Sequence, residues 1–172
     1  MTLNRLKKIW DNGEYALNGW LSINNSFIAE IMSRQNYDTL TIDMQHGLID
    51  YSDLIGMLQG ITGSNVTPIV RVPWLDPGYI MKALDAGAQG IISPMINNKK
   101  EAEEFVSYMR YPPLGNRSFG PTRQNIVQGS DYYKTANENV LCIAMIETAE
   151  AMKNLEEIIG TDGLDAVYIG PA

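Results

Sequence analysis

Short apolar runs alternate with amphipathic stretches along almost the whole chain. Continuous apolar runs of this length predict buried strands, at residues 15–23, 39–44, 67–73, 90–95, 139–147 and 164–171. Apolar positions three or four residues apart indicate the longer helices, and the helices we expect cover residues 2–12, 26–35, 50–63, 76–88, 98–111, 131–137 and 148–161. Residues 112–130 carry neither pattern and predict an irregular segment.

Strands that are apolar throughout and alternate with helices are typical of an α/β fold with a parallel sheet covered by helices. Six such strands fit either a doubly wound sheet or part of a (β/α)₈ TIM barrel. The first strand is followed by "SINNS" rather than by a glycine-rich phosphate loop, which disfavours a dinucleotide-binding domain. Because no linker interrupts the pattern, we expect residues 1–172 to form a single domain.

Composition excludes several classes of partner. The chain carries 13 basic and 20 acidic residues, a net charge of −7, so it should repel nucleic acid. Its single cysteine, Cys142, lies in an apolar run, which excludes a disulfide framework and a cysteine-rich metal site. The start of the chain lacks the core of a signal peptide, and no apolar run reaches membrane-spanning length. We therefore expect a cytoplasmic protein with no membrane partner.

Polar groups gather where the predicted strands end. In strand order the candidates are Trp20; Asp43 and His46; Arg71; Glu147; and Gly170, Pro171 and Ala172. His46 is the only histidine among the 172 residues. In a barrel the carboxyl ends of the strands meet at one mouth. A carboxylate, a guanidinium and an imidazole together suit metal binding, oxyanion stabilisation and proton transfer.

Asp85 is a further candidate, late in the helix predicted at 76–88. It is either a solvated helix residue or a carboxylate that orients His46 through the second ring nitrogen.

At this point several motifs resemble one family. "DMQHG", "PIVRVPWLDP", "KALDAGAQGIISPM", "RYPPLGNRSFGP", "MIETAEAMKNLEEI" and "DAVYIGPA" resemble the HpcH/HpaI aldolases. These are class II, metal-dependent pyruvate aldolases of the phosphoenolpyruvate/pyruvate superfamily. The resemblance runs in order from Trp20 to Ala172 and implies a (β/α)₈ barrel.

The resemblance also implies roles for the strand-end residues. His46 matches the catalytic histidine, Asp85 the aspartate paired with it, and Arg71 the arginine that stabilises the enolate. Glu147 matches a carboxylate ligand of the divalent metal, which would be Mg²⁺, Mn²⁺ or Co²⁺. The remaining matches line the substrate site: Trp20, Asp43, Gly170, Pro171 and Ala172.

The implied reaction is the cleavage of 4-hydroxy-2-oxo acids to pyruvate and an aldehyde. Two alternatives remain open: a lyase acting on a CoA thioester, as in the citrate-lyase β-like branch, and an inactive chain. We expect the choice of aldehyde to depend partly on residues 112–130, with Arg117, Ser118 and Arg123.

The sequence departs from the family pattern in three places. Met145 stands where better-known members have glutamine, and Gln45 where many have glutamate. The chain also ends at Ala172, before the aspartate that supplies the second metal ligand. A full barrel has about 250 residues, so we expect a C-terminally incomplete barrel of about six βα units. Such a chain should bind metal weakly or not at all and should associate with other copies.

Overall fold

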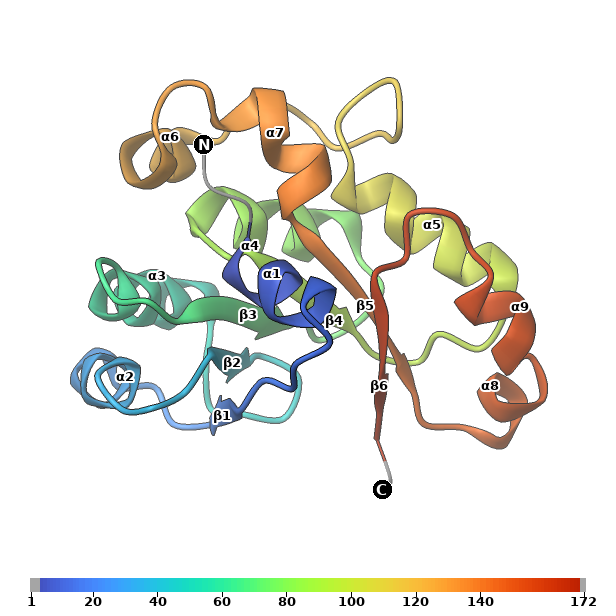
Figure 1. Cartoon of the computed structure of the whole chain (residues 1–172), viewed down its shortest axis with the longest axis horizontal. Helices are drawn as coiled ribbons and strands as arrows, with labels where there is room; N and C mark the ends of the chain where they lie inside the picture. Colours follow the sequence, from blue (N-terminus) through green and yellow to red (C-terminus); the bar gives the residue numbers. More distant parts are fainter. Residues whose placement is uncertain (1–3, 171–172) are drawn as a thin grey trace.

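The computed structural model describes residues 4–170 and contains one parallel sheet (Figure 1). Its six strands are β1 (Asn18–Leu21), β2 (Thr39–Asp43), β3 (Thr67–Arg71), β4 (Gly90–Ser93), β5 (Leu141–Ile146) and β6 (Ala166–Ile169). Each strand pairs in parallel with the next one in the chain, in the order β1-β2-β3-β4-β5-β6. A doubly wound sheet reverses its strand order at a switch point. The uninterrupted order is instead that of consecutive βα units in a TIM barrel.

Nine helices accompany this sheet within residues 4–170. They are α1 (Arg5–Asp11), α2 (Ser26–Ser33), α3 (Tyr51–Ile61), α4 (Pro77–Ala86), α5 (Lys99–Met109), α6 (Thr122–Gln128), α7 (Tyr132–Asn139), α8 (Ala149–Lys153) and α9 (Leu155–Ile159). Local sequence explains their starts. The side chains of Asn25, Asp76 and Asn98 accept hydrogen bonds from backbone N–H groups in the first turns of α2, α4 and α5.

Side chains alternate between the two faces of the sheet, as parallel strands require. One face forms the main core with the helices: Leu40, Val70 and Ile91 pack there with Leu54 and Phe105. The opposite face carries Ile69, Ile92 and Ile143, which pack with Leu6 of α1. Figure 1 shows α1 lying over this second face.

The sheet is strongly curled. Trp20 of β1 and Tyr168 of β6 belong to the first and the last strand, yet their rings stack with centroids 5.6 Å apart. Side chains from opposite edges can meet only when the face that carries them is concave. This face therefore corresponds to the interior of a barrel.

Two helix predictions were wrong. Residues 112–130 contain α6, because a buried Gln124 anchors it by donating to the carbonyl of Ala88 rather than through an apolar stripe. The single helix predicted at 148–161 is divided into α8 and α9 at Asn154, whose side-chain amide donates to the carbonyl of Asn97.

A helix needs about 20 apolar residues to cross the hydrocarbon core of a bilayer. None of the helices within residues 4–170 is long and apolar enough to do so.

Candidate functional site

Asp43 and Arg71 form a buried ion pair at the carboxyl ends of β2 and β3. The two residues are direct neighbours in the strand register. Arg71 donates from Nε to Asp43 Oδ1 at 2.9 Å and from Nη2 to Asp43 Oδ2 at 2.6 Å. Their side chains are 10% and 4% exposed. This two-point contact fixes the guanidinium plane and leaves Nη1 directed elsewhere.

Asp43 also holds the turn that carries His46. Its Oδ1 accepts from the backbone N–H groups of Gln45 at 3.0 Å and His46 at 3.2 Å, and its Oδ2 accepts from Trp20 Nε1 at 3.3 Å. One carboxylate thereby positions Arg71, Trp20 and the segment after β2. The side chain of His46 projects from this segment and is exposed.

Opposing effects act on the pKa of Asp43, and the net result is a pKa below its ordinary value of 3.8. Burial alone would raise the pKa. The hydrogen bonds from Arg71, the backbone N–H of His46 and Trp20, together with the charge of Arg71, lower it by more. Asp43 is therefore ionised at neutral pH and acts there as an anionic anchor rather than as a proton donor.

The lowered pKa predicts a loss of stability in acid. Because the folded chain binds the Asp43 proton less readily than the unfolded chain, the stabilisation is complete above the ordinary pKa of 3.8 and is lost as pH falls through the lower folded value. Urea titrations between about pH 6 and pH 3 should show a steeper fall in the free energy of unfolding for wild type than for Asp43→Asn. Equal slopes would contradict this account.

Apolar side chains surround the Arg71 guanidinium. Arg71 Cζ lies 4.9 Å from the centroid of the Trp20 ring, and Trp20 stacks on Tyr168. On another side, Arg71 Nη1 lies 3.9 Å from the sulfur of Met145, which is 4% exposed. The charge is thus held in a largely dry setting, where its hydrogen bonds are stronger than in water.

Glu147 follows β5 at the same end of the sheet. Its Oε1 accepts from the backbone N–H of Met95 at 2.8 Å. Met95 has φ 57°, the one positive φ at a non-glycine residue in the described part of the chain. The loops after β4 and β5 are also tied together by a hydrogen bond from Thr148 to Asn97. These contacts hold the Glu147 carboxylate in a defined place.

Gly170 follows β6 and is buried next to the same group. A Cβ atom at this position would lie 2.2 Å from the Met145 methyl and 3.4 Å from Glu147 Cβ, so a side chain does not fit without movement. The candidates Pro171 and Ala172 lie outside the described residues.

These groups fit a divalent metal only in part. Glu147 offers one carboxylate, the Asp43 carboxylate is engaged by Arg71, and the Met145 thioether is a poor ligand for hard cations. Within residues 4–170 there is no group of three or more histidine, cysteine or acidic side chains placed to hold a metal. The described residues therefore supply a single hard ligand and do not make a metal centre by themselves.

Asp85 lies apart from this cluster. Helix α4 begins after β3 and runs back toward the start of β4, so Asp85 is about 12 Å along the axis from Pro77. Its Oδ1 accepts from Nη2 of Arg117 at 2.7 Å. The structure therefore places Asp85 in an ion pair with Arg117, and a catalytic role beside His46 stays a prediction.

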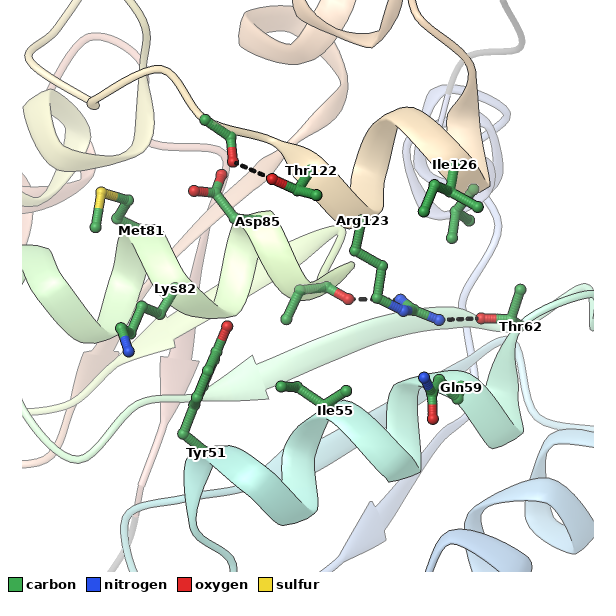
Figure 2. Close-up of a pocket in the computed structure, with 13 residues that line it drawn as sticks. Tyr51, Ile55, Gln59, Thr62, Met81, Lys82, Asp85, Thr122, Arg123 and Ile126 are labelled. Atoms are coloured by element: carbon green, nitrogen blue, oxygen red, sulfur yellow. Dashed lines mark hydrogen bonds between the residues drawn. The ribbon is translucent and has the colours of Figure 1, made fainter.

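Asp85 lines a groove between α3, α4 and α6 that has a volume of about 720 Å³. Figure 2 shows the residues that line it. Tyr51, Lys82 and Arg123 also line this groove, whereas none of the strand-end residues does. This large groove is therefore separate from the strand-end cluster.

The 112–130 segment lies away from the strand-end cluster. It joins α5 to α7, which leads into the amino end of β5, whereas the cluster lies at the carboxyl ends of the strands. Arg117 is buried against Asp85 and the hydroxyl of Tyr132, and Arg123 donates to Ala86 and Thr62 of neighbouring helix ends. Arg117 and Arg123 are thus held by contacts away from the strand ends of this chain, and a part for residues 112–130 in the choice of aldehyde stays a prediction.

Two residues of the cluster were missed from the sequence. Met95 and Tyr168 both sit at or just beyond strand ends, but neither carries a charge. The alternation along β6 could have indicated Tyr168, because it shares a face with Gly170.

Comparison with known proteins identifies relatives of the chain. Residues 17–172 match the family model described as HpcH/HpaI aldolase/citrate lyase. A hydroxypyruvate/pyruvate aldolase from Rhizorhabdus wittichii is 46% identical over 169 residues, which cover 98% of this chain and 67% of that protein. A 4-hydroxy-2-oxo-heptane-1,7-dioate aldolase from Escherichia coli is 37% identical, over 98% of this chain and 66% of its own length.

A solved structure of an HpcH/HpaI aldolase/citrate lyase family protein from Burkholderia cenocepacia superposes with a TM-score of 0.88 at 34% identity. The match covers 98% of this chain and 69% of the other. The chain thus spans about two thirds of the length of these relatives. The family model matches most of the chain, the first relative is 46% identical, and the chain belongs to the HpcH/HpaI aldolase/citrate lyase family.

Proposed function

We propose that this chain carries the site of a metal-dependent aldolase, which cleaves 4-hydroxy-2-oxo acids to pyruvate and an aldehyde. The observation that supports it most is the Arg71 guanidinium. Asp43 holds two of its nitrogens, and the third, Nη1, lies on the side of Met145, Gly170 and Glu147. A fixed cation beside a carboxylate at a barrel mouth suits a reaction that develops an enolate.

His46 and Arg71 are the residues of the chain that we propose act in the cleavage. A base beside His46 takes the proton of the 4-hydroxyl group, and the C3–C4 bond breaks as the hydroxyl carbon becomes an aldehyde. The bonding electrons pass into the 2-oxo group and give the enolate of pyruvate, whose oxygen Arg71 Nη1 stabilises. Such a donor typically contributes about 3 kcal/mol. Protonation of the enolate carbon then yields pyruvate.

Glu147 would supply one ligand to a divalent metal, and such a metal would act as a Lewis acid toward the oxo acid. Mg²⁺, Mn²⁺ and Co²⁺ all accept carboxylate oxygen, so Glu147 does not discriminate among them. Trp20, Asp43 and the backbone of Gly170, Pro171 and Ala172 complete the proposed substrate site. The name of the Escherichia coli relative contains a substrate of this class, 4-hydroxy-2-oxo-heptane-1,7-dioate.

The substrate class tests this proposal. Two proteins are produced: the chain alone, and the chain joined to the last third of the Rhizorhabdus relative. Pyruvate release by each is followed with lactate dehydrogenase and NADH. We expect cleavage of free 4-hydroxy-2-oxo acids with Mn²⁺ present. Cleavage of malyl-CoA but not of the free acids would favour the CoA-thioester alternative. If neither protein cleaves the free acids or malyl-CoA, the proposed lyase activity is contradicted.

Metal affinity is expected to be low for the chain alone. A single carboxylate ligand binds hard cations poorly, so the dissociation constant for Mn²⁺ should lie above about 100 μM. Isothermal titration calorimetry measures this directly. A dissociation constant for Mn²⁺ in the micromolar range would contradict this prediction.

Association between copies is also part of the proposal. Within the described residues, the outer strands β1 and β6 each pair with a neighbouring strand on only one side. Apolar side chains are exposed beside these two strands: Leu17 at 55%, Ile23 at 60% and Ile169 at 57%. Exposed apolar edges favour pairing with another chain. Light scattering should give a mass above the 19.2 kDa monomer, and a monomer at all concentrations would contradict this.

A cytoplasmic location, expected from the lone buried Cys142, also remains part of the proposal.

A further inference from the structure

The hydrogen bonds of Arg71 are unequal. Nε and Nη2 donate to the Asp43 carboxylate at 2.9 and 2.6 Å, as strong charge-assisted bonds. Nη1 instead faces the sulfur of Met145 at 3.9 Å. A thioether is a weak acceptor. Nη1 is therefore the guanidinium nitrogen whose partner a stronger oxygen acceptor can replace at little cost.

Met145 is held firmly in this position. It lies on β5, two residues before Glu147, and its side chain packs on the concave face with Ile143. Its register partner is Tyr168 of β6, and its methyl group fills the space that a Cβ at position 170 would need. With 4% of its surface exposed, it separates Arg71 from Gly170 without adding a charge or a strong dipole.

Four side chains then form a closed ring across the barrel mouth. Arg71 contacts Met145, Met145 pairs with Tyr168, Tyr168 stacks on Trp20, and Trp20 lies under the guanidinium. Arg71 has two direct neighbours in this ring, Trp20 and Met145, and they offer it a π-face and a thioether but no oxygen acceptor. An oxygen that reaches Nη1 from a ligand therefore replaces only the weak contact with the Met145 sulfur.

We infer that Met145 is a specificity-determining residue, which fills the site beside Arg71 while keeping Nη1 available for the oxo or enolate oxygen of a 2-oxo acid. The inference rests on the proposed function and deepens it. A residue of similar length with an amide oxygen would accept a hydrogen bond from Nη1 and compete with the substrate. A residue of similar size with no acceptor would leave Nη1 available.

Two substitutions separate these cases: Met145→Leu, which removes the acceptor, and Met145→Gln, which strengthens it. Pyruvate binding to the 172-residue chain is measured by ligand-observed NMR, with thermal unfolding to confirm that each variant is folded. We expect Met145→Gln to bind pyruvate about tenfold more weakly than Met145→Leu, the equivalent of one hydrogen bond. Equal affinities of all three proteins, or an equal loss in both variants, would overturn the inference.

A second measurement needs no variant. The methyl group of Met145 is labelled with ¹³C and followed while pyruvate is added. A shift that saturates with the binding curve is expected, because the ligand oxygen replaces the sulfur at Nη1. Absence of that shift, or of any pyruvate binding, would contradict the inference.

Cleavage assays keep this result separate from the proposed function. Pyruvate binding with the expected order of affinities but no cleavage of any 4-hydroxy-2-oxo acid would contradict the function alone. Cleavage with a Met145→Gln affinity equal to that of Met145→Leu would contradict the inference alone.

Discussion

Arg71→Ala is expected to abolish pyruvate release and to lower the free energy of unfolding by about 3 kcal/mol. Removing the guanidinium leaves the Asp43 carboxylate, 4% exposed, without its two strongest donors. The remaining donors, Trp20 Nε1 and two backbone N–H groups, do not neutralise its charge. The same change removes the cation proposed to stabilise the enolate. Urea denaturation measures the first effect, and the coupled pyruvate assay measures the second.

Arg5→Ala is the matched control. Arg5 also pairs with an aspartate, Asp38, at 2.7 Å, but its side chain is 45% exposed. Exposed pairs contribute at most about 1 kcal/mol because water and salt screen them. If both substitutions lowered the free energy of unfolding equally, burial would not explain the large stability effect expected for the Asp43–Arg71 pair.

Asp85→Ala is expected to lower the free energy of unfolding by about 3 kcal/mol as well. The side chain of Arg117 is fully buried, and Asp85 is the acidic group that pairs with it in the described structure. Arg117 also contacts the hydroxyl of Tyr132 at 3.0 Å and the rings of Tyr111 at 4.4 Å and of Tyr132 at 5.7 Å. Neither carries a full negative charge, so removal of Asp85 leaves an uncompensated cation in the interior. Thermal and urea unfolding both measure this loss.

Two further variants sharpen the Asp85 experiment. Asp85→Asn keeps an acceptor oxygen and should lose less stability than Asp85→Ala. Asp131→Ala removes a carboxylate that pairs with Lys134 at the exposed surface and should cause no measurable change. An Asp85→Ala protein as stable as wild type, with strongly reduced pyruvate release, would instead support the catalytic role predicted from the family resemblance.

The fold could be predicted from the sequence because its signals are local. The apolar runs at 39–44 and 139–147 became β2 and β5, and Asp76-Pro77 marks the start of α4. Helix α6 escaped prediction because its anchor, Gln124, is polar and bonds to a residue 36 positions away. The break between α8 and α9 likewise depends on a distant carbonyl, that of Asn97.

The candidate site could be predicted in part for the same reason. Strand ends are visible in the sequence, so Asp43, Arg71 and Glu147 could be grouped from their positions along the chain. The partner of Asp85 could not, because its position late in α4 places it toward the amino ends of the strands, where Arg117 arrives from a segment 32 residues later. The weak contact between Arg71 and Met145 could not be predicted either, since an apolar residue in a strand usually indicates packing alone.

The most direct test of the central claim, that the strand-end residues form an aldolase site, is pyruvate release from a 4-hydroxy-2-oxo acid. It is measured for the chain joined to the last third of its Rhizorhabdus relative, with Mn²⁺ present. Wild type should release pyruvate, and His46→Ala, Arg71→Lys and Glu147→Gln should each slow the release by about 100-fold or more. Wild-type rates in all three variants would contradict the claim.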